Sequence, residues 1–367
     1  MGSKREEQHR SILDSLDKRG VSRREFLGFC SAMAAALSLP ASYGATIAEA
    51  LETKKKPVVV WLEMQACTGD TESLLRASKP KVGDLILDVI SYDYHETIMA
   101  PAAKQAEKSL ADVVKNHKGQ YIAIVEGSIP TADGGVYCCI GGRTGVDIIK
   151  EVCGNAAAVI AAGNCAWDGG LAAAKPNPTG AKGVKDIISN VPIVNLPGCP
   201  MNVENLTAVI VHFLTFRKLP VLDTMGRPLF AYGKRIHDNC ERRAHFDAGQ
   251  FVRSWGDEGH RQGWCLYEMG CKGPETYHNC PTIKWNEGTS WPVQSGHPCI
   301  GCAAPHFWDA MGGGGFYRRL PNVPGFGVES TADGIGTKLA IATAGALAAH
   351  GVARALKGKS DDKEGKE

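Results

Sequence analysis

The chain has 367 residues, of which 44% are hydrophobic, so it is long enough for two or three domains with cores of their own. Its formal net charge is +2, which gives no basis for binding nucleic acid or a strongly acidic partner. Its 13 cysteines, 43 glycines and 19 prolines predict metal-binding loops with much irregular backbone.

The N-terminus has the features of an export signal. Residues 22–27 contain the pair Arg23-Arg24, an apolar stretch follows over residues 27–39, and Ala48-Glu49-Ala50 is a suitable cleavage site. We therefore predict that residues 1–50 are a twin-arginine signal peptide that takes no part in the fold and is removed together with Cys30. Because the twin-arginine route moves folded proteins, it suits a protein that receives its metal in the cytoplasm. The alternative is a cytosolic amphipathic helix in which the two arginines are adjacent by chance.

Residues 51–222 alternate between strand and helix patterns. Short apolar runs rich in β-branched residues predict strands over residues 58–62, 85–91, 121–125, 158–162 and 193–196. Helices are predicted over residues 72–77, 100–115, 147–152, 184–189 and 203–216. Such alternation implies right-handed crossovers, so we expect a flavodoxin-like, doubly wound parallel sheet with helices on both faces.

Three cysteines follow strands of this predicted sheet. Cys67 comes after the first strand, Cys165 after the fourth and Cys199 after the fifth. Because ligands of open α/β sheets bind at the carboxyl ends of the strands, we expect these thiols to gather at one edge. Each has a glycine nearby that lets the backbone approach a bulky inorganic group: Gly69, Gly163 and Gly198. The alternative is three buried structural cysteines.

Residues 223–330 are rich in Gly, Pro, His, Trp and Cys and have few long apolar periods, so we expect an irregular domain whose core is built around metal. His237 and Cys240 share one face of a helical turn, and Cys265 and Cys271 follow. Further on are Cys280, Cys299 and Cys302. Disulfides are an alternative in an exported protein. A closed zinc site takes four ligands, so it fits poorly with separate sets of four and three donors. Iron–sulfur clusters take about three or four protein ligands each and match both sets.

The C-terminal part, residues 331–367, combines an apolar run over residues 335–356 with a charged tail. As a helix, the run is long enough to cross a bilayer, with Lys338 and Arg354 near its ends. The alternative is a buried or interface helix of a soluble assembly.

Several motifs of this chain resemble those of nickel–iron hydrogenase small subunits, in particular the membrane-bound uptake type. The matching segments are Trp61-Leu62-Glu63, Cys67-Thr68-Gly69-Asp70-Thr71-Glu72-Ser73, Gly127-Ser128-Ile129-Pro130, Leu196-Pro197-Gly198-Cys199-Pro200, Ile236-His237-Asp238-Asn239-Cys240, Gly263-Trp264-Cys265-Leu266, Gly270-Cys271-Lys272-Gly273-Pro274 and Gly296-His297-Pro298-Cys299-Ile300-Gly301-Cys302. The resemblance extends from about Lys56 to Asp309, and includes the signal and the tail.

The resemblance implies three iron–sulfur clusters in a row: two 4Fe-4S clusters and one 3Fe-4S cluster. A proximal set would hold the first 4Fe-4S cluster: Cys67, Asp70, Cys165 and Cys199. A medial set would hold the 3Fe-4S cluster: Cys280, Cys299 and Cys302. A distal set would hold the second 4Fe-4S cluster: His237, Cys240, Cys265 and Cys271. The implied function is to conduct electrons from H2 oxidation, which takes place at the nickel–iron site of the large subunit, to a membrane acceptor.

The chain departs from the usual family pattern at the proximal set. Asp70 stands where the family usually has a fourth cysteine. We favour ligation of iron by the Asp70 carboxylate, with a water-derived ligand or a three-iron cluster as the alternatives. Gly69 and Gly170 replace two extra cysteines of an oxygen-tolerant type, so a six-cysteine cluster is not predicted. Glu72 resembles the family's acidic residue beside this loop; it either relays protons or only complements a helix dipole.

The tail of such proteins docks on a cytochrome b or another membrane acceptor, and His350 lies where these tails carry a histidine close to haem. The equally open alternative is a histidine that faces headgroups or solvent. The expected location is the periplasm or the outer face of the cytoplasmic membrane, with the C-terminal helix as anchor. The remaining cysteines, Cys138, Cys139 and Cys153, match no cluster motif and are interpreted as packing residues. Two other functions remain open: a free multi-cluster carrier of the ferredoxin type, and a structural zinc protein.

Overall fold

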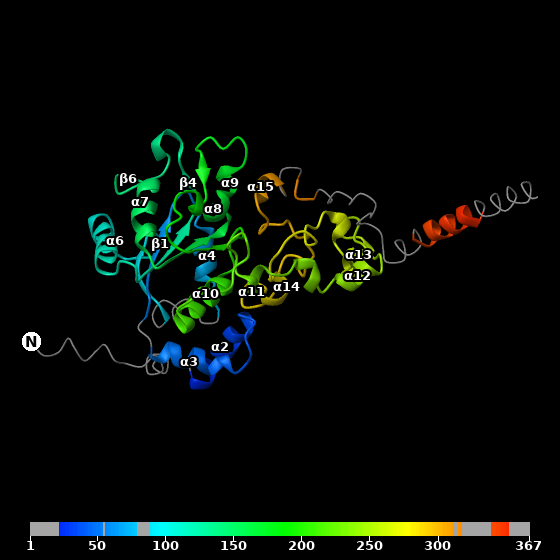
Figure 1. The fold of residues 1–367 in the computed structure, drawn as a ribbon, viewed down its shortest axis with the longest axis horizontal. Coiled ribbons are helices and arrows are strands. Elements are labelled where there is room, and N and C mark those ends of the chain that lie inside the picture. Colours follow the sequence, from blue (N-terminus) through cyan, green and yellow to red (C-terminus); the bar gives the residue numbers. More distant parts are fainter. Residues whose placement is uncertain (1–21, 54–55, 79–88, 311–314, 318–338, 352–367) are drawn as a thin grey trace, which may run out of the picture.

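A five-stranded parallel sheet organises the first half of the chain. The computed structural model describes residues 22–53, 56–78, 89–310, 315–317 and 339–351 (Figure 1). The strands are β1 (Val58–Glu63), β2 (Ser91–His95), β3 (Ile122–Glu126), β7 (Ala158–Ala162) and β9 (Ile193–Leu196). Their spatial order, β2-β1-β3-β7-β9, confirms the predicted flavodoxin-like topology.

The sheet is covered on both faces because its central strands are apolar on both sides. One core cluster joins Val60, Leu62 and Val125 to α6 (Lys104–Asn116) and α7 (Gly145–Val152). The other joins Val59, Trp61 and further strand residues to α4 (Gly69–Leu75) and α10 (Val203–Phe216). The sheet is therefore doubly wound, as the alternating pattern predicts.

The second strand was predicted in the wrong place. The expected strand over residues 85–91 lies partly outside the described residues, and β2 begins only at Ser91. It is an edge strand with the polar sequence Ser-Tyr-Asp-Tyr-His, and three of its five residues are only half-buried. Because an edge strand is not enclosed on both sides, it lacks the apolar run that marks the central strands.

Connections complete the α/β part with short elements. They are β4 (Ile129–Pro130) paired with β8 (Ala181–Lys182), the hairpin β5 (Cys139–Ile140) and β6 (Arg143–Thr144), α8 (Gly163–Asp168), α9 (Gly170–Ala173), and the 3₁₀ turns η3 (Ala132–Gly135), η4 (Cys153–Asn155) and η5 (Val184–Asp186).

The prediction that the remaining cysteines are packing residues is confirmed for Cys153, which is fully buried, and is wrong for Cys139, which is exposed on the hairpin.

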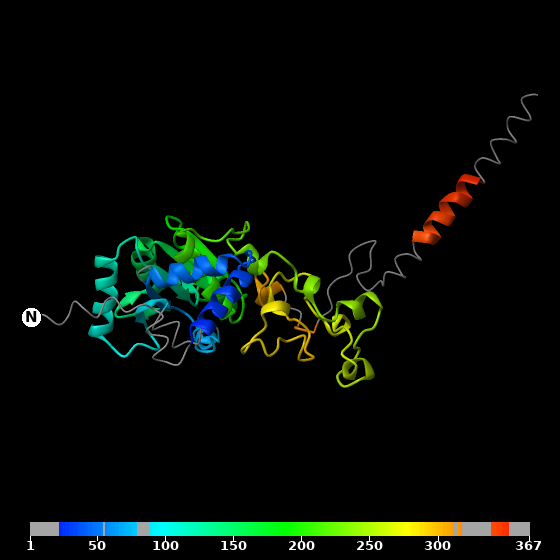
Figure 2. The ribbon, with the colours of Figure 1, turned by 90° about the horizontal axis from the view of Figure 1, so that it is seen from below.

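The N-terminal segment takes part in the fold of the full chain, contrary to expectation. Helices α2 (Arg23–Ala36) and α3 (Tyr43–Thr53) pack against each other and against α10 (Figures 1 and 2). Phe26, Cys30 and Ile47 belong to the same core cluster as the sheet, because both helices present an apolar stripe. Arg23 and Arg24 remain exposed. Removal of this segment as a signal peptide stays a prediction.

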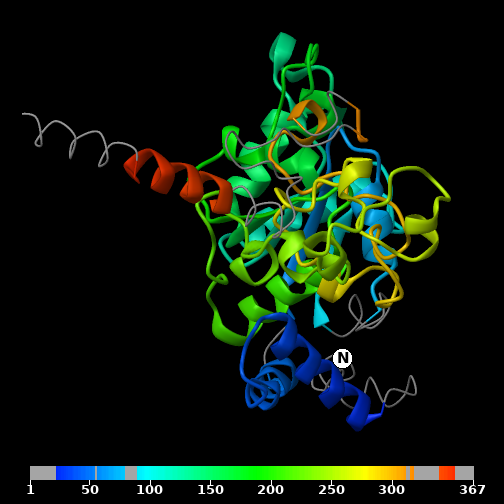
Figure 3. The same ribbon diagram turned by 90° about the vertical axis from the view of Figure 1, so that its right-hand side faces the viewer.

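The cysteine-rich part lies to one side of the sheet and has little regular structure (Figures 1 and 3). Its elements are α11 (Leu229–Tyr232), η6 (Ile236–Asn239), α12 (Arg243–Asp247), α13 (Glu258–Arg261), η7 (Tyr267–Met269), α14 (Cys280–Ile283) and α15 (Phe307–Ala310). Its small core contains Cys280 and Cys299 among Ile236, Leu266 and Trp291. The predicted ligands thus form part of the core itself.

The C-terminal prediction is met only in part. Residues 339–351 are helical and exposed, while the remainder of the apolar run over 335–356 lies outside the described residues. In the part of the chain that the structure describes, no helix has both the length and the apolar character needed to span a membrane.

Candidate iron–sulfur sites

The proximal set converges at the carboxyl edge of the sheet, as the sequence predicts. Cys67 follows β1, Asp70 lies in the first turn of α4, Cys165 lies in α8 and Cys199 follows β9. Burial is the main cause that raises the pKa of both Cys165 and Cys199 to about 12, and Asp70 and Cys67 raise it further in each case. Part of Cys199 is exposed, but the surrounding protein removes water from its thiol. Asp70 and Cys67 therefore act on both thiols across this edge of the sheet.

Two glycines make room for this set. At Gly163, where φ is +75°, a Cβ atom would lie 2.2 Å from Asp70 Oδ2. At Gly170, where φ is +53°, it would lie 2.6 Å from Cys165 Sγ. Both positions therefore combine a left-handed backbone with a space that only glycine leaves open.

Asp70 is a buried carboxylate, with 8% of its surface exposed. Its Oδ1 accepts a hydrogen bond of 2.7 Å from the backbone N–H of Met201. Burial, with a smaller contribution from the neighbouring Glu126, raises the pKa of Asp70 to about 7. A cation at this position would offset that cost and keep the carboxylate ionised, which is the condition for a metal ligand.

Glu126 is a functional residue that our reading of the sequence missed. It ends β3 on the edge that carries the cysteines, and only 1% of its surface is exposed. Its carboxylate accepts hydrogen bonds from Trp61 Nε1 at 3.0 Å, from the N–H groups of Asp70 and Thr71 at 3.0 Å, and from Thr71 Oγ1 at 2.6 Å. It thereby fixes the loop that carries Cys67 and Asp70. A charged residue that ends an otherwise apolar strand was the available signal.

The proximal set is tied directly to the medial set. Asn164 exchanges hydrogen bonds with Gly198, and its side chain donates to the backbone carbonyl of Cys302. A hydrogen bond from the backbone of Cys199 lowers the pKa of Cys302, which burial otherwise raises. One member of each set is therefore in direct contact with the other.

The medial set is the most deeply enclosed. Cys280 and Cys299 are buried, and burial raises the pKa of both thiols far above the ordinary value. The neighbouring Cys302 contributes to the raised pKa of both thiols by charge repulsion. No sequence pattern points to His278, whose Nδ1 lies 3.0 Å from Cys280 Sγ and whose pKa burial lowers to about 4.

The distal set gathers three thiols beside η6. Burial raises the pKa of Cys240 to about 11 and that of Cys265 to about 12, and Cys271 raises both further. The ring of His237 packs edge-on against Phe246 with centroids 4.7 Å apart. Burial, with a contribution from Arg243, lowers the pKa of His237 to about 4, so its imidazole is neutral near pH 7 and can offer a lone pair.

A second contact joins the medial and distal sets. The backbone N–H of Cys299 donates to Cys271 Sγ at 3.4 Å. The backbone N–H of Lys272 donates to the carbonyl of Cys299 at 2.7 Å. The three sets therefore form a continuous series in the order proximal, medial, distal.

The donor chemistry fits iron–sulfur clusters. In the described part of the chain, no three His, Cys, Asp or Glu side chains are arranged to hold a single metal ion. Cluster ligands bind separate irons, and thiolates are the ligands such irons prefer. Burial shifts the pKa of ten of these cysteine, histidine and aspartate side chains toward the neutral form, so they are costly to ionise alone. Iron supplies the positive charge that stabilises thiolate and carboxylate.

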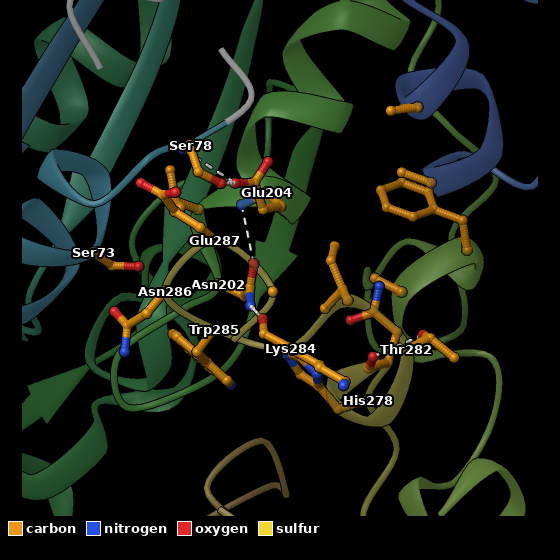
Figure 4. A pocket seen from close by; sticks show the side chains of 18 of the residues that line it. Ser73, Ser78, Asn202, Glu204, His278, Thr282, Lys284, Trp285, Asn286 and Glu287 are labelled. Carbon is orange, nitrogen blue, oxygen red and sulfur yellow. Dashed lines mark hydrogen bonds between the residues drawn. The ribbon is translucent and has the colours of Figure 1, made fainter. Parts of the chain in front are cut away.

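A surface cavity of about 710 Å³ opens next to the proximal set. It is lined by Gly69, Glu72 and Pro200 and by residues of α2. Residues in and around α14, among them His278, Thr282 and Lys284, also line it (Figure 4). Two lining residues are linked to each other, because Nδ2 of Asn202 donates a hydrogen bond to the carbonyl of Lys284 at 2.8 Å. Cys67 is exposed, and the cavity is lined by Gly69, which lies close to Cys67 in sequence, and by Pro200, which directly follows Cys199. Glu72 is exposed in the first turn of α4, and His350 is exposed on the C-terminal helix; both of their predicted roles stay predictions.

Two family models match the chain and together cover both of its parts. The model for the C-terminal domain of the NiFe/NiFeSe hydrogenase small subunit matches residues 232–313. The model described as NADH ubiquinone oxidoreductase, 20 Kd subunit, matches residues 67–213. The fold and these matches define a redox-enzyme subunit that pairs an α/β domain with a cysteine-rich domain.

Individual relatives narrow this class. The uptake hydrogenase small subunit of Afipia carboxidovorans is 50% identical, over 95% of this chain and 94% of its own. The quinone-reactive Ni/Fe-hydrogenase small chain of Wolinella succinogenes is 46% identical, over 92% and 97%. A solved [NiFeSe]-hydrogenase of Desulfomicrobium baculatum is 34% identical, with a TM-score of 0.68 over 73% of this chain and 100% of that chain. The chain belongs to the small subunits of NiFe hydrogenases, which are electron-transfer subunits and leave the active site to the large subunit.

Proposed function

We propose that this chain conducts electrons from H2 oxidation in a NiFe large subunit through three iron–sulfur clusters to a membrane acceptor. The observation that carries the proposal is the pair of contacts that joins the three donor sets, Cys199 with Cys302 and Cys271 with Cys299. Donors that touch in this order provide short steps between one relay and the next. A free ferredoxin-type carrier would need the clusters without the doubly wound domain.

The proposed assignment follows the three sets. A proximal 4Fe-4S cluster would be held by Cys67, Asp70, Cys165 and Cys199. A medial 3Fe-4S cluster would be held by Cys280, Cys299 and Cys302. A distal 4Fe-4S cluster would be held by His237, Cys240, Cys265 and Cys271. Clusters bound there would transfer one electron at a time, with no proton gained or lost by the ligands.

The protein's own residues prepare the proximal site. Glu126 holds the backbone of Asp70 and Thr71, and the Met201 N–H holds one carboxylate oxygen of Asp70. Gly163 and Gly170 keep the space beside Asp70 and Cys165 open. The exposed Cys67 and the adjoining cavity mark the face on which the large subunit would dock and exclude water from the proximal site.

The proposed electron acceptor lies in the membrane. The Wolinella relative is described as quinone-reactive. In this chain residues 339–351 form an exposed helix that projects away from the body (Figures 1 and 2), with the apolar side chains Leu339, Ile341 and Leu347 uncovered. An apolar helix without cover suits a membrane or a cytochrome b, and would place the enzyme at the outer face of the cytoplasmic membrane.

Purification of the native complex tests the function. Iron, sulfide and nickel are quantified, and EPR is recorded during a redox titration. The expected result is iron and sulfide in the amounts that two 4Fe-4S clusters and one 3Fe-4S cluster require, with nickel on a co-purified partner. Zinc without sulfide would contradict the proposal, and intact clusters without a nickel-containing partner would favour the free carrier.

The role of Asp70 is tested by Asp70→Cys. If the carboxylate binds iron, replacing oxygen by sulfur changes the ligand field, so the pulse EPR spectrum and the midpoint potential of the reduced proximal cluster should both change. The distal and medial signals serve as the internal control. Identical proximal spectra and potentials in the two proteins would show that Asp70 is not a ligand.

A further inference from the structure

Two buried cations lie in the cysteine-rich part. Lys272 has no exposed surface, and its Nζ donates to the carbonyls of Gly270 and Phe316. Arg242 is 9% exposed, and its Nη1 donates to the carbonyl of Trp264 at 2.7 Å. Because a charged side chain is costly to bury, two such residues in one small core call for a functional reason.

Both cations face the distal set. The backbone N–H of Arg242 donates to Cys240 Sγ at 3.4 Å, and its guanidinium bonds the carbonyl of Trp264, the residue directly before Cys265. Lys272 directly follows Cys271, and its Nζ bonds the carbonyl of Gly270, the residue directly before Cys271. The backbone N–H of the same lysine bonds the carbonyl of Cys299, so Lys272 lies where the medial and distal sets meet.

The buried charged group beside the proximal set is instead a carboxylate. Glu126 is 1% exposed and accepts a hydrogen bond of 3.0 Å from the backbone N–H of Asp70. A third buried cation, Arg227, is ion-paired with Asp223 at 2.8 Å, so its charge is largely balanced. Near the distal set, Glu241 opposes the two cations, but it is exposed and therefore screened by solvent.

We propose that Arg242 and Lys272 set the direction of electron flow, because their charges stabilise the reduced state at the distal set relative to the proximal set. The inference rests on the proposed function. In the step concerned, the proximal group loses one electron and the distal group gains it, with no bond broken and no proton moved. The electron adds negative charge at the distal set, where the two cations attract it through a low-dielectric interior.

The test compares midpoint potentials in the complete heterodimer by EPR redox titration. Lys272→Met and Arg242→Gln should each lower the distal midpoint potential and leave the proximal one unchanged. We expect the equilibrium constant for moving an electron from the proximal to the distal group to fall roughly tenfold or more per charge removed. The ratio of H2 oxidation to H2 evolution rates should fall in the same direction.

Two matched variants separate charge from structure. Arg253→Gln removes an exposed cation of the same part, whose side chain is 75% exposed, and should leave all potentials unchanged. Glu241→Gln removes the opposing carboxylate without touching a buried cation, and should raise the distal potential slightly. If Lys272→Met loses its iron, the distal midpoint potentials of Arg242→Gln and Glu241→Gln test the proposal instead. Full iron content with unmoved distal potentials in both would overturn the inference, whereas loss of all cluster signals from the unmodified complex would instead overturn the proposed function.

Discussion

Substitution of Phe26 by alanine should release the N-terminal helices from the body of the full-length chain. Phe26 is 4% exposed and belongs to the core cluster that joins α2 and α3 to α10 and the sheet. Removing a buried phenylalanine side chain costs both its transfer free energy and the cavity that remains, about 3–5 kcal/mol in protein cores. If α2 stays docked only through this contact surface, the ratio of docked to released helix should fall between about 100-fold and a few thousand-fold.

Hydrogen exchange of the full-length chain measures this ratio. Peptides that cover α2 and α3 should exchange much faster in Phe26→Ala, while peptides from the central strands should remain protected. Leu27→Ala is the control, because Leu27 lies on the same helix but is 42% exposed and should leave protection unchanged. Equal protection of α2 in Phe26→Ala and in the unmodified chain would refute the reasoning, since the buried apolar stripe would then not hold the segment in place.

Two further substitutions test the space at the proximal set. Gly163→Ala should displace Asp70, because the new methyl group would lie 2.2 Å from Oδ2 at a φ of +75°; we expect loss of the proximal EPR signal with distal signals retained, and an unchanged proximal signal would contradict it. Gly170→Cys should lower the iron content per chain instead of adding a fourth cysteine ligand to the proximal set, because its Cβ would lie 2.6 Å from Cys165 Sγ. A variant with full iron content and a new proximal spectrum would show that the loop adapts.

The parts of the fold that were predicted correctly are those where one physical requirement dominates the sequence. Strands β7 and β9 and helix α10 have the predicted bounds, because a strand enclosed on both faces and a helix packed on a sheet need continuous apolar runs. Strand β2 was misplaced because an edge strand has no such requirement. The N-terminal helices were expected outside the fold because their export features and their apolar stripe are the same residues, and only the tertiary structure shows which surface the stripe meets.

The candidate site was predictable to a different depth. The gathering of Cys67, Cys165 and Cys199 follows from strand topology alone, since carboxyl ends of parallel strands share an edge. The grouping of the downstream donors into sets of four and three follows from their order along the chain, whereas their assignment to a distal and a medial cluster came from the family resemblance. Glu126 had a signal in the sequence, a charge at the end of an apolar strand, but Lys272 had none, because its burial depends on what surrounds it in the fold.

Shared hydrogen bonds explain why the three sets depend on one another. Asn164 of the α/β part bonds both Gly198 and Cys302, and Lys272 bonds the medial set while it lies beside the distal set. A donor set that shares hydrogen bonds with the next cannot shift without disturbing it, so these hydrogen bonds restrain the distances between the sets. Because electron transfer requires short and constant separations, this interlocking of two otherwise different domains is what a chain of iron–sulfur relays needs. The carboxyl edge of the doubly wound sheet thus carries the donors of the proposed proximal cluster next to those of the proposed medial cluster.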